Sequence, residues 1–144
     1  MICDLTLYLS IMQRMLIFHY RGPQCYSEDP CPAGLHYWFS HAYETGFQFD
    51  DVAAITSDYT ASCSPDRGAE STKAFFGINH FVSIPNRDAS EELGTASMLK
   101  TRISECSAVN DQFVSAILVD FASETSLLEV TQDHNRALAS RRAA

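Results

Sequence analysis

Residues 113–120 read Phe-Val-Ser-Ala-Ile-Leu-Val-Asp, an almost unbroken apolar run that ends on a carboxylate. Such a run is typical of a parallel strand whose two faces are both covered. Residues 74–82 form a second apolar run, and a helical pattern separates the two. Another helical pattern follows residue 120. This order of strand, helix, strand and helix predicts parallel strands joined by right-handed crossovers, and therefore an α/β protein.

The predicted helix between the two runs has one apolar face. Its positions follow one another at steps of three or four residues, and they are Ala89, Leu93, Ala96, Leu99, Ile103 and Cys106. Asp88 and Glu91 have the spacing of a capping box, which places the helix N-cap at Asp88. Gly94 lies inside this helix and weakens it by about 1 kcal/mol relative to alanine.

The other segments are less regular. Residues 15–20 predict a short buried strand that ends at a turn, and residues 22–36 and 56–72 predict loops. Ser123 is the expected N-cap of the last helix. The expected inner face of that helix consists of Leu127, Val130, His134 and Ala137.

The composition is that of one folded domain. The chain has 144 residues, of which 46% are hydrophobic, and this is enough to bury a core. Ten basic and eighteen acidic residues give a net charge of -8. This balance argues against a nucleic-acid-binding surface, which needs clustered Lys and Arg, and against electrostatic docking on an anionic membrane.

Five cysteines are present, and none belongs to a CxxC pair, so a zinc knuckle is not expected. Cys25 and Cys31 flank a short loop and can close it as a disulfide. Cys63 and Cys106 are then available for a longer bridge, and Cys3 stays unpaired. Other pairings remain open, and so does a protein with buried free thiols.

The amino-terminal residues do not resemble a secretion signal. Residues 1–14 lack the basic start and the small-residue cleavage site of a signal peptide. We interpret them as the remnant of a preceding helix or loop of a longer protein, residues 15–140 as one domain, and residues 141–144 as a frayed tail. No run approaches the roughly 20 apolar residues that a transmembrane helix needs.

Polar side chains occur where the apolar strands end. They are Arg21, Asn79, His80 and Asp120. Since chemistry in parallel α/β sheets lies beyond the carboxyl ends of the strands, these residues are the candidates for a site. Each also has a structural interpretation. Asp120 can cap the helix that follows it, Asn79 can bond a loop carbonyl with His80 turned away, and Arg21 can be an exposed turn residue.

Five short segments carry a resemblance to a known family. They are residues 31–38 (CPAGLHYW), 47–51 (FQFDD), 63–68 (CSPDRG), 76–81 (FGINHF) and 118–121 (LVDF). In the order and spacing of these segments, the chain resembles the late part of the phospholipase C-like phosphodiesterase superfamily. The closest likeness is to its secreted members similar to the X domain of phosphatidylinositol-specific phospholipase C.

The resemblance implies a TIM (β/α)8 barrel, of which the present strands are roughly the last three. It also implies a phosphoric diester hydrolase that acts on lipid or phosphoinositide-type substrates through two histidines. Imidazoles suit this acid–base role because their pKa lies near the working pH. In the family these histidines belong to early strands, and no matching segment occurs here. We therefore expect the chain to be incomplete and inactive alone, so that its status as an enzyme stays open.

Individual residues acquire roles from the same resemblance. Asp120 in Val-Asp-Phe matches an aspartate that orients a catalytic histidine. Ala122 departs from the family, which often has a tyrosine at this position. Asn79 and His80 are expected to contact the substrate at the mouth of the barrel, and Arg21 is expected to bind a phosphate by paired hydrogen bonds.

The resemblance further implies a phosphodiester or phospholipid substrate, an extracellular location and no cofactor. Some relatives use calcium, but no ligands for it can be named in this sequence. Two other functions remain open: a non-catalytic truncated remnant, and a small secreted binding module stapled by disulfides.

Overall fold

The computed structural model describes residues 17–19, 35–68 and 73–142. The chain divides into two compact units, residues 1–41 and 42–144. The described elements of the first unit are β1 (Ile17–His19), β2 (Leu35–Tyr37) and α2 (Trp38–His41). β1 and β2 pair in parallel. β1 falls inside the strand that residues 15–20 predict.

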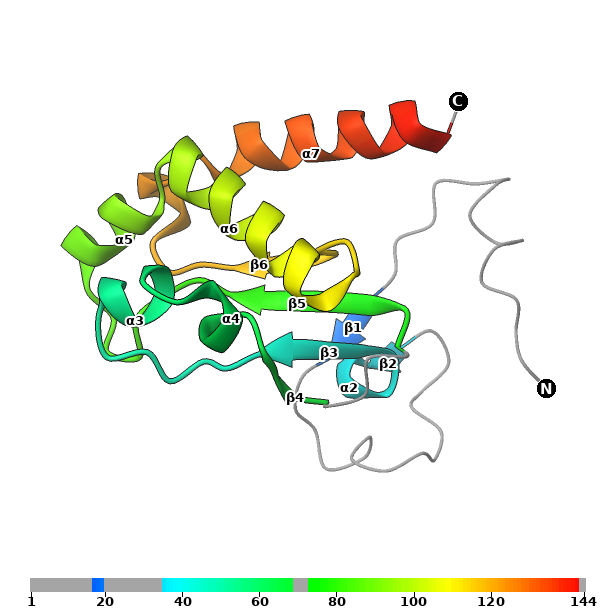
Figure 1. Cartoon of the computed structure of the whole chain (residues 1–144), viewed down its shortest axis with the longest axis horizontal. Helices are drawn as coiled ribbons and strands as arrows, with labels where there is room; N and C mark the ends of the chain where they lie inside the picture. Colours follow the sequence, from blue (N-terminus) through cyan, green and yellow to red (C-terminus); the bar gives the residue numbers. More distant parts are fainter. Residues whose placement is uncertain (1–16, 20–34, 69–72, 143–144) are drawn as a thin grey trace. The chain divides into compact units, whose positions relative to one another are not determined.

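The second unit contains a four-stranded mixed sheet in the order β4-β3-β5-β6 (Figure 1). Its strands are β3 (Ala42–Thr45), β4 (Pro65–Arg67), β5 (Phe75–Asn79) and β6 (Ala116–Leu118). β3, β5 and β6 are parallel neighbours, whereas β4 pairs with β3 in the antiparallel direction. The α/β class and the parallel pairing of the two apolar runs are thus confirmed.

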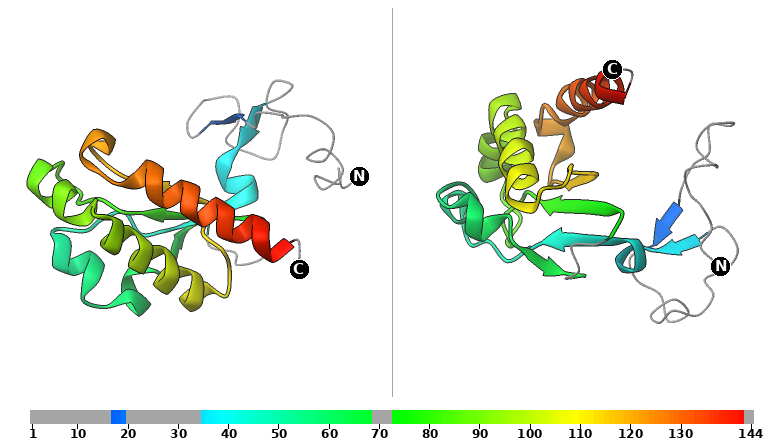
Figure 2. Two further views of the ribbon diagram at one scale, coloured as in Figure 1. Left: turned by 90° about the horizontal axis from the view of Figure 1, so that it is seen from above. Right: turned by 45° about the vertical axis from the view of Figure 1, so that its right-hand side comes forward.

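Helices of the second unit lie on one face of this sheet and beside the carboxyl ends of its strands (Figure 1, Figure 2). They are α3 (Val52–Thr56), α4 (Tyr59–Ser62), α5 (Arg87–Leu93), α6 (Ala96–Asn110) and α7 (Leu127–Arg142), with a 3-10 turn, η1 (Ala122–Glu124), before α7. The core between sheet and helices consists of Tyr43, Cys63, Phe76, Ile78, Leu99, Ile103, Cys106, Val114 and Val130. Side chains alternate between the faces of a strand, so the residues between these core positions face the other way.

A smaller core lies beside the first and includes Phe49, Ile55, Val82 and Leu93. Ile55 belongs to α3 and Leu93 to α5, while Phe49 and Val82 belong to the loops that follow β3 and β5. These loops leave the sheet at the carboxyl ends of their strands. The smaller core therefore stabilises the loops around the polar residues of that edge.

The single helix predicted from Asp88 to Cys106 is wrong, because the chain forms two helices there. Asn86 caps α5 instead of Asp88, and its Oδ1 accepts a hydrogen bond from Ala89 N at 3.2 Å. α5 ends at Leu93, and Thr95 then caps α6. The apolar spacing continues across the break, so periodicity alone did not reveal it.

The loop predicted at residues 56–72 is also wrong within its described part. Asp58 accepts a hydrogen bond from Ala61 N at 3.1 Å and starts α4. β4 then pairs with β3, with Arg67 opposite Glu44. Both elements are short, and β4 depends on a distant partner, so neither has a periodic pattern in the sequence.

The last helix begins later than predicted. Ser123 lies in η1, and Thr125 Oγ1 accepts the hydrogen bond from Leu127 N at 3.3 Å where α7 starts. Val130 is buried and Leu127 packs against the core, as predicted, but Ala137 is exposed. α7 therefore packs on the core through its first turns only, and Ala137 lies beyond the part that the sheet and α6 cover.

Gly94 ends α5 in a crowded place. A Cβ at this position would lie 2.6 Å from Ser90 O and 2.6 Å from Thr125 Cγ2, which is far inside ordinary contact. We expect Gly94→Ala to lower the free energy of unfolding, measured by urea titration, by about 1–3 kcal/mol, because the chain around Thr125 must move.

Gly46→Ala is the matched control for this change. The nearest atom to its added Cβ, Phe49 Cζ, is 3.9 Å away, so the methyl group fits. This control is expected to leave the stability unchanged or to raise it slightly. A Gly94→Ala protein as stable as the control would show that the contact with Thr125 is not tight.

Candidate functional site

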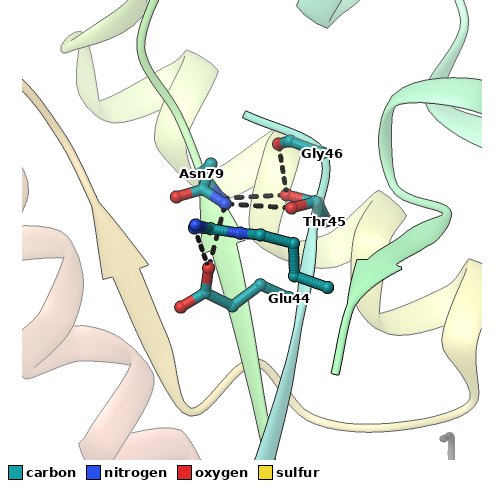
Figure 3. A network of polar contacts seen from close by, with 5 residues as sticks. Glu44, Thr45, Gly46 and Asn79 are labelled. Atoms are coloured by element: carbon teal, nitrogen blue, oxygen red, sulfur yellow. Dashed lines mark hydrogen bonds and ion pairs between the residues drawn. The ribbon is translucent and has the colours of Figure 1, made fainter. Parts of the chain in front are cut away.

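Polar side chains converge where β3 and β5 end. Glu44 and Asn79 are both fully buried, with 0% of each exposed. Asn79 Nδ2 donates hydrogen bonds to Thr45 O at 2.9 Å and to Glu44 Oε2 at 3.3 Å (Figure 3). The backbone N–H of Asn79 donates to Thr45 Oγ1 at 2.9 Å. These contacts join the carboxyl ends of two parallel strands into one polar cluster, which we call the edge cluster.

The register of the sheet puts both side chains on one face. Glu44 pairs with Gly77 across β3 and β5, and Asn79 follows Gly77 by two residues. Phe76 and Ile78 point to the helices and belong to the main core. Because alternate residues share a face, Glu44 and Asn79 lie on the face away from that core.

Arg67 of β4 completes the edge cluster. Its Nη2 lies 2.5 Å from Glu44 Oε2, and its guanidinium carbon lies 4.4 Å from the ring centroid of Phe47. The antiparallel pairing places Arg67 directly opposite Glu44. A buried carboxylate needs such a partner, because an unpaired charge in this position is strongly unfavourable.

Asn79 keeps one unused acceptor. Both hydrogens of its amide nitrogen face oxygen acceptors, which fixes the orientation of the side chain. Its Oδ1 has no hydrogen-bond partner within residues 17–19, 35–68 and 73–142. A buried amide oxygen of this kind suits a donor such as a hydroxyl group.

Glu44 and Arg67 are not among the site residues predicted from the sequence. A signal was present for each: Glu44 is an acidic residue between Tyr43 and Thr45 in an otherwise uncharged stretch, and Arg67 belongs to the segment at residues 63–68. Their meeting depends on the pairing of β3 with β4, which no local pattern predicts.

His80 faces the helices and not the edge cluster. Its ring Nε2 lies 3.0 Å from Leu93 O, so it donates a hydrogen bond there in the neutral ring, and 2% of the residue is exposed. Its Nδ1 has no partner within the described segments. Burial, with a smaller contribution from the charge of Arg102, lowers the pKa of His80 to about 4.

This lowered pKa makes the stability depend on pH. The unfolded chain takes up a proton near pH 6.5, whereas folded His80 does so only near pH 4. The unfolded state therefore binds more protons within this window, and the fold loses stability as the pH falls through it. We expect the loss to reach about 3 kcal/mol between pH 6.5 and 4.

The measurement is urea unfolding at several values from pH 7 to 4. His80→Gln removes the titrating ring and should flatten the pH dependence in this window, whatever its effect at pH 7. If wild type and variant lose stability in parallel, His80 is not the responsible group.

Asp120 follows β6 at the same edge of the sheet. Asn79 is in register with Leu118, so Asp120 stands two residues beyond the end of the paired region. Asp120 is half-buried and makes no hydrogen bond or ion pair within the described residues. Phe121 has a left-handed backbone (φ 47°), so the chain turns directly after Asp120.

The structure brings only part of the predicted site together. Asn79 and Asp120 lie at one edge of the sheet, whereas the His80 ring lies on the helix side. Arg21, Cys25 and Cys31 fall outside the described residues, so nothing follows for them or for the bridge drawn between the two cysteines. Cys63 and Cys106, the other pair drawn from the sequence, form a disulfide.

The described residues contain no group of three or more His, Cys, Asp or Glu side chains placed to hold a metal ion. No helix among them is both long and apolar enough to cross a bilayer. In comparisons with known proteins, no protein-family model, no curated protein and no solved structure matches this chain. The edge cluster, with Asp120 beside it along the sheet edge, is therefore the candidate site on its geometry alone.

Proposed function

We propose that this chain forms one wall of a phospholipase C-like phosphodiesterase site for lipid or phosphoinositide-type substrates, and that it does not catalyse the reaction alone. The observation that carries the proposal is the edge cluster at the carboxyl ends of β3 and β5, on the sheet face away from the helices. The type of reaction, hydrolysis of a phosphodiester, is taken from the family resemblance of the sequence.

The order of the strands supports an arc of a β/α barrel. β3, β5 and β6 are adjacent, parallel and in chain order. α4, α6 and α7 all pack on the same face. A doubly wound sheet would carry helices on both faces, whereas a barrel carries them on the outside only. In this proposal the Glu44–Asn79 face is the inside of the barrel.

The edge residues suit substrate binding and positioning. Asp120 is half-buried and available to orient a histidine. The unused Oδ1 of Asn79 is an acceptor for a substrate hydroxyl, but Asn79 is 0% exposed, so binding there requires its surroundings to open. Within residues 42–68 and 73–142 the histidines are His80, turned to Leu93, and His134 of α7. His134 lines a groove with Phe75 and Ala116, at the amino ends of the strands. Neither ring suits acid–base catalysis at the edge cluster, so the proposal assigns binding and not turnover to this chain.

Binding and turnover are separable in one set of experiments. Backbone amide NMR of the chain is recorded with myo-inositol 1-phosphate, and with myo-inositol as the control without phosphate. Shifts at Gly46, His80 and Asp120 that saturate with the phosphate compound are expected, and Asp120→Asn should reduce them. Hydrolysis of bis(p-nitrophenyl) phosphate is expected not to exceed the rate in buffer. Shifts confined to other surfaces would exclude the proposed site, and clear hydrolysis would refute the claim that the chain is inactive alone.

The binding module that the sequence left open remains the second candidate. The observation in its favour is that Glu44 is already neutralised by Arg67, while the Cys63–Cys106 disulfide joins α4 to α6. In that case the edge cluster only stabilises the sheet, and myo-inositol 1-phosphate shifts none of its amides.

A further inference from the structure

Arg102 of α6 is a cation in the interior of the second unit. It is 0% exposed. Its Nη1 donates hydrogen bonds to Ile55 O at 3.2 Å and to Ser62 Oγ, and its Nη2 donates to Ser62 O at 2.7 Å. The rings of Phe49 and Tyr59 lie 5.8 and 5.9 Å from its guanidinium carbon.

None of these partners carries a full negative charge. No salt bridge to Arg102 occurs within the described segments, and its Nε has no hydrogen-bond partner there. Burial lowers the pKa of Arg102 to about 10, so the guanidinium remains charged at neutral pH. Buried charges in proteins are normally paired with an opposite charge, whereas the described acceptors of Arg102 are neutral oxygens.

A disulfide sulfur also contacts the guanidinium of Arg102. Cys63 Sγ lies 3.4 Å from Arg102 Nη1 and is bonded to Cys106 Sγ. Cys106 lies one helical turn after Arg102 on α6. Both cysteines are fully buried. In this oxidised form Cys63 is neutral and contributes only a weak acceptor to Arg102.

We propose that Cys63–Cys106 is a redox site, and that reduction converts Cys63 into a thiolate paired with Arg102. A thiolate next to arginine is stabilised and has a lowered pKa, whereas a thiol buried among apolar groups has a raised one. Arg102 is already buried beside Cys63, so the thiolate meets a cation that water does not screen. Two ionisable side chains interact with Arg102: Tyr59, whose ring faces it, and the buried His80, whose protonation the charge of Arg102 disfavours.

The reaction balances with a dithiol as the reductant. Because both sulfurs are fully buried, the bridge must first be exposed by local opening of the chain. One dithiol thiolate then attacks Cys106 Sγ, the S–S bond breaks, and Cys63 leaves as a thiolate that pairs with Arg102 when the chain closes again. The second thiol of the reductant then attacks the mixed disulfide and releases Cys106. The dithiol loses two electrons and becomes its cyclic disulfide. The protein gains these two electrons and then carries one thiolate and one thiol. One proton is released to water. Cys63 is the better leaving group because a thiol of lower pKa leaves faster.

The first test uses the intact protein with a monothiol. The protein is equilibrated with reduced and oxidised glutathione, quenched with acid, and the site of the glutathione adduct is mapped by mass spectrometry. When glutathione is attached to Cys106, Cys63 is free as a thiolate that can pair with Arg102. When glutathione is attached to Cys63, this thiolate does not form and the ion pair with Arg102 is lost. We expect Cys106 to carry roughly tenfold more adduct than Cys63. Equal labelling, or an excess on Cys63, would overturn the proposal.

The second test compares two variants that both lack the bridge. Cys106→Ser retains Cys63 beside Arg102, and Cys63→Ser retains Cys106 without that contact. Thiolate absorbance near 240 nm is followed against pH, and the difference between the two variants cancels the three remaining cysteines. The pKa of Cys63 is expected to lie below the ordinary thiol value of about 8.5, because Arg102 stabilises the thiolate, and that of Cys106 at or above this value.

Arg102→Met in the Cys106→Ser background should raise the pKa of Cys63 above 8.5, since the cation is removed. A Cys63 pKa of 8.5 or more in the presence of Arg102 would refute the thiolate. If the variants do not fold, the glutathione experiment on the intact protein still decides between the two outcomes.

Discussion

Arg102→Ala is expected to lower the free energy of unfolding by about 3–5 kcal/mol, which is a large fraction of the stability of a domain of this size. The change leaves Ile55 O, Ser62 O and Ser62 Oγ without the donors that Arg102 provides. It also opens a cavity under α6, because the whole side chain is buried. Urea unfolding followed by far-UV circular dichroism measures the loss.

Lys100→Ala is the matched control on the same helix. Lys100 pairs with Asp133 of α7 at 3.0 Å, but 50% of its side chain is exposed. Solvent screens such a pair, so removal of Lys100 is expected to change the stability little. If the two variants lose similar stability, the buried hydrogen bonds of Arg102 do not hold α4 against α6.

The elements that the sequence predicted well are those with local patterns. The strand at residues 74–82 was predicted because it is a short apolar run, and the face of α6 was predicted from its regular spacing. The break at Gly94 was missed, since the contacts made there involve residues distant in the sequence: Thr125 packs against Gly94, and Ser126 N donates a hydrogen bond to Gly94 O at 2.8 Å. β4 was missed for a similar reason, as it pairs with β3, a strand distant in the sequence.

The same distinction applies to the candidate site. Asn79 and Asp120 were identified because each ends an apolar run, and parallel strands bring their ends to one edge. His80 was expected at this edge too, but its ring packs between α5 and the sheet and bonds Leu93 O. Glu44 and Arg67 meet only through the antiparallel pairing of β4.

Arg102 had a signal in the sequence that was not used. It follows Leu99 by three residues and precedes Cys106 by four, so it belongs to the buried face of α6. A charged residue on such a face needs partners within the core. Here those partners are the carbonyl of Ile55 in α3 and the carbonyl and hydroxyl of Ser62 at the end of α4, which only the folded chain brings near.

Replacement of both Cys63 and Cys106 by alanine is expected to lower the free energy of unfolding by about 4 kcal/mol. The disulfide joins residues 43 positions apart, and closure of a loop of this length removes much entropy from the unfolded chain. Urea unfolding should also show a larger m-value for the variant, because its unfolded state is less compact and exposes more surface.

Reduced wild type provides the comparison that separates chain entropy from local contacts. Both proteins lack the cross-link, but reduced wild type keeps Cys63 Sγ beside Arg102, and the alanine variant leaves that nitrogen without its sulfur acceptor. Reduced wild type is therefore expected to be more stable than the double variant, and the difference should shrink at acidic pH, where Cys63 is protonated. If the two proteins have equal stability at every pH, the disulfide acts through the unfolded chain alone. A double variant as stable as oxidised wild type would mean that the bridge adds nothing to the α4–α6 packing that Arg102 already maintains.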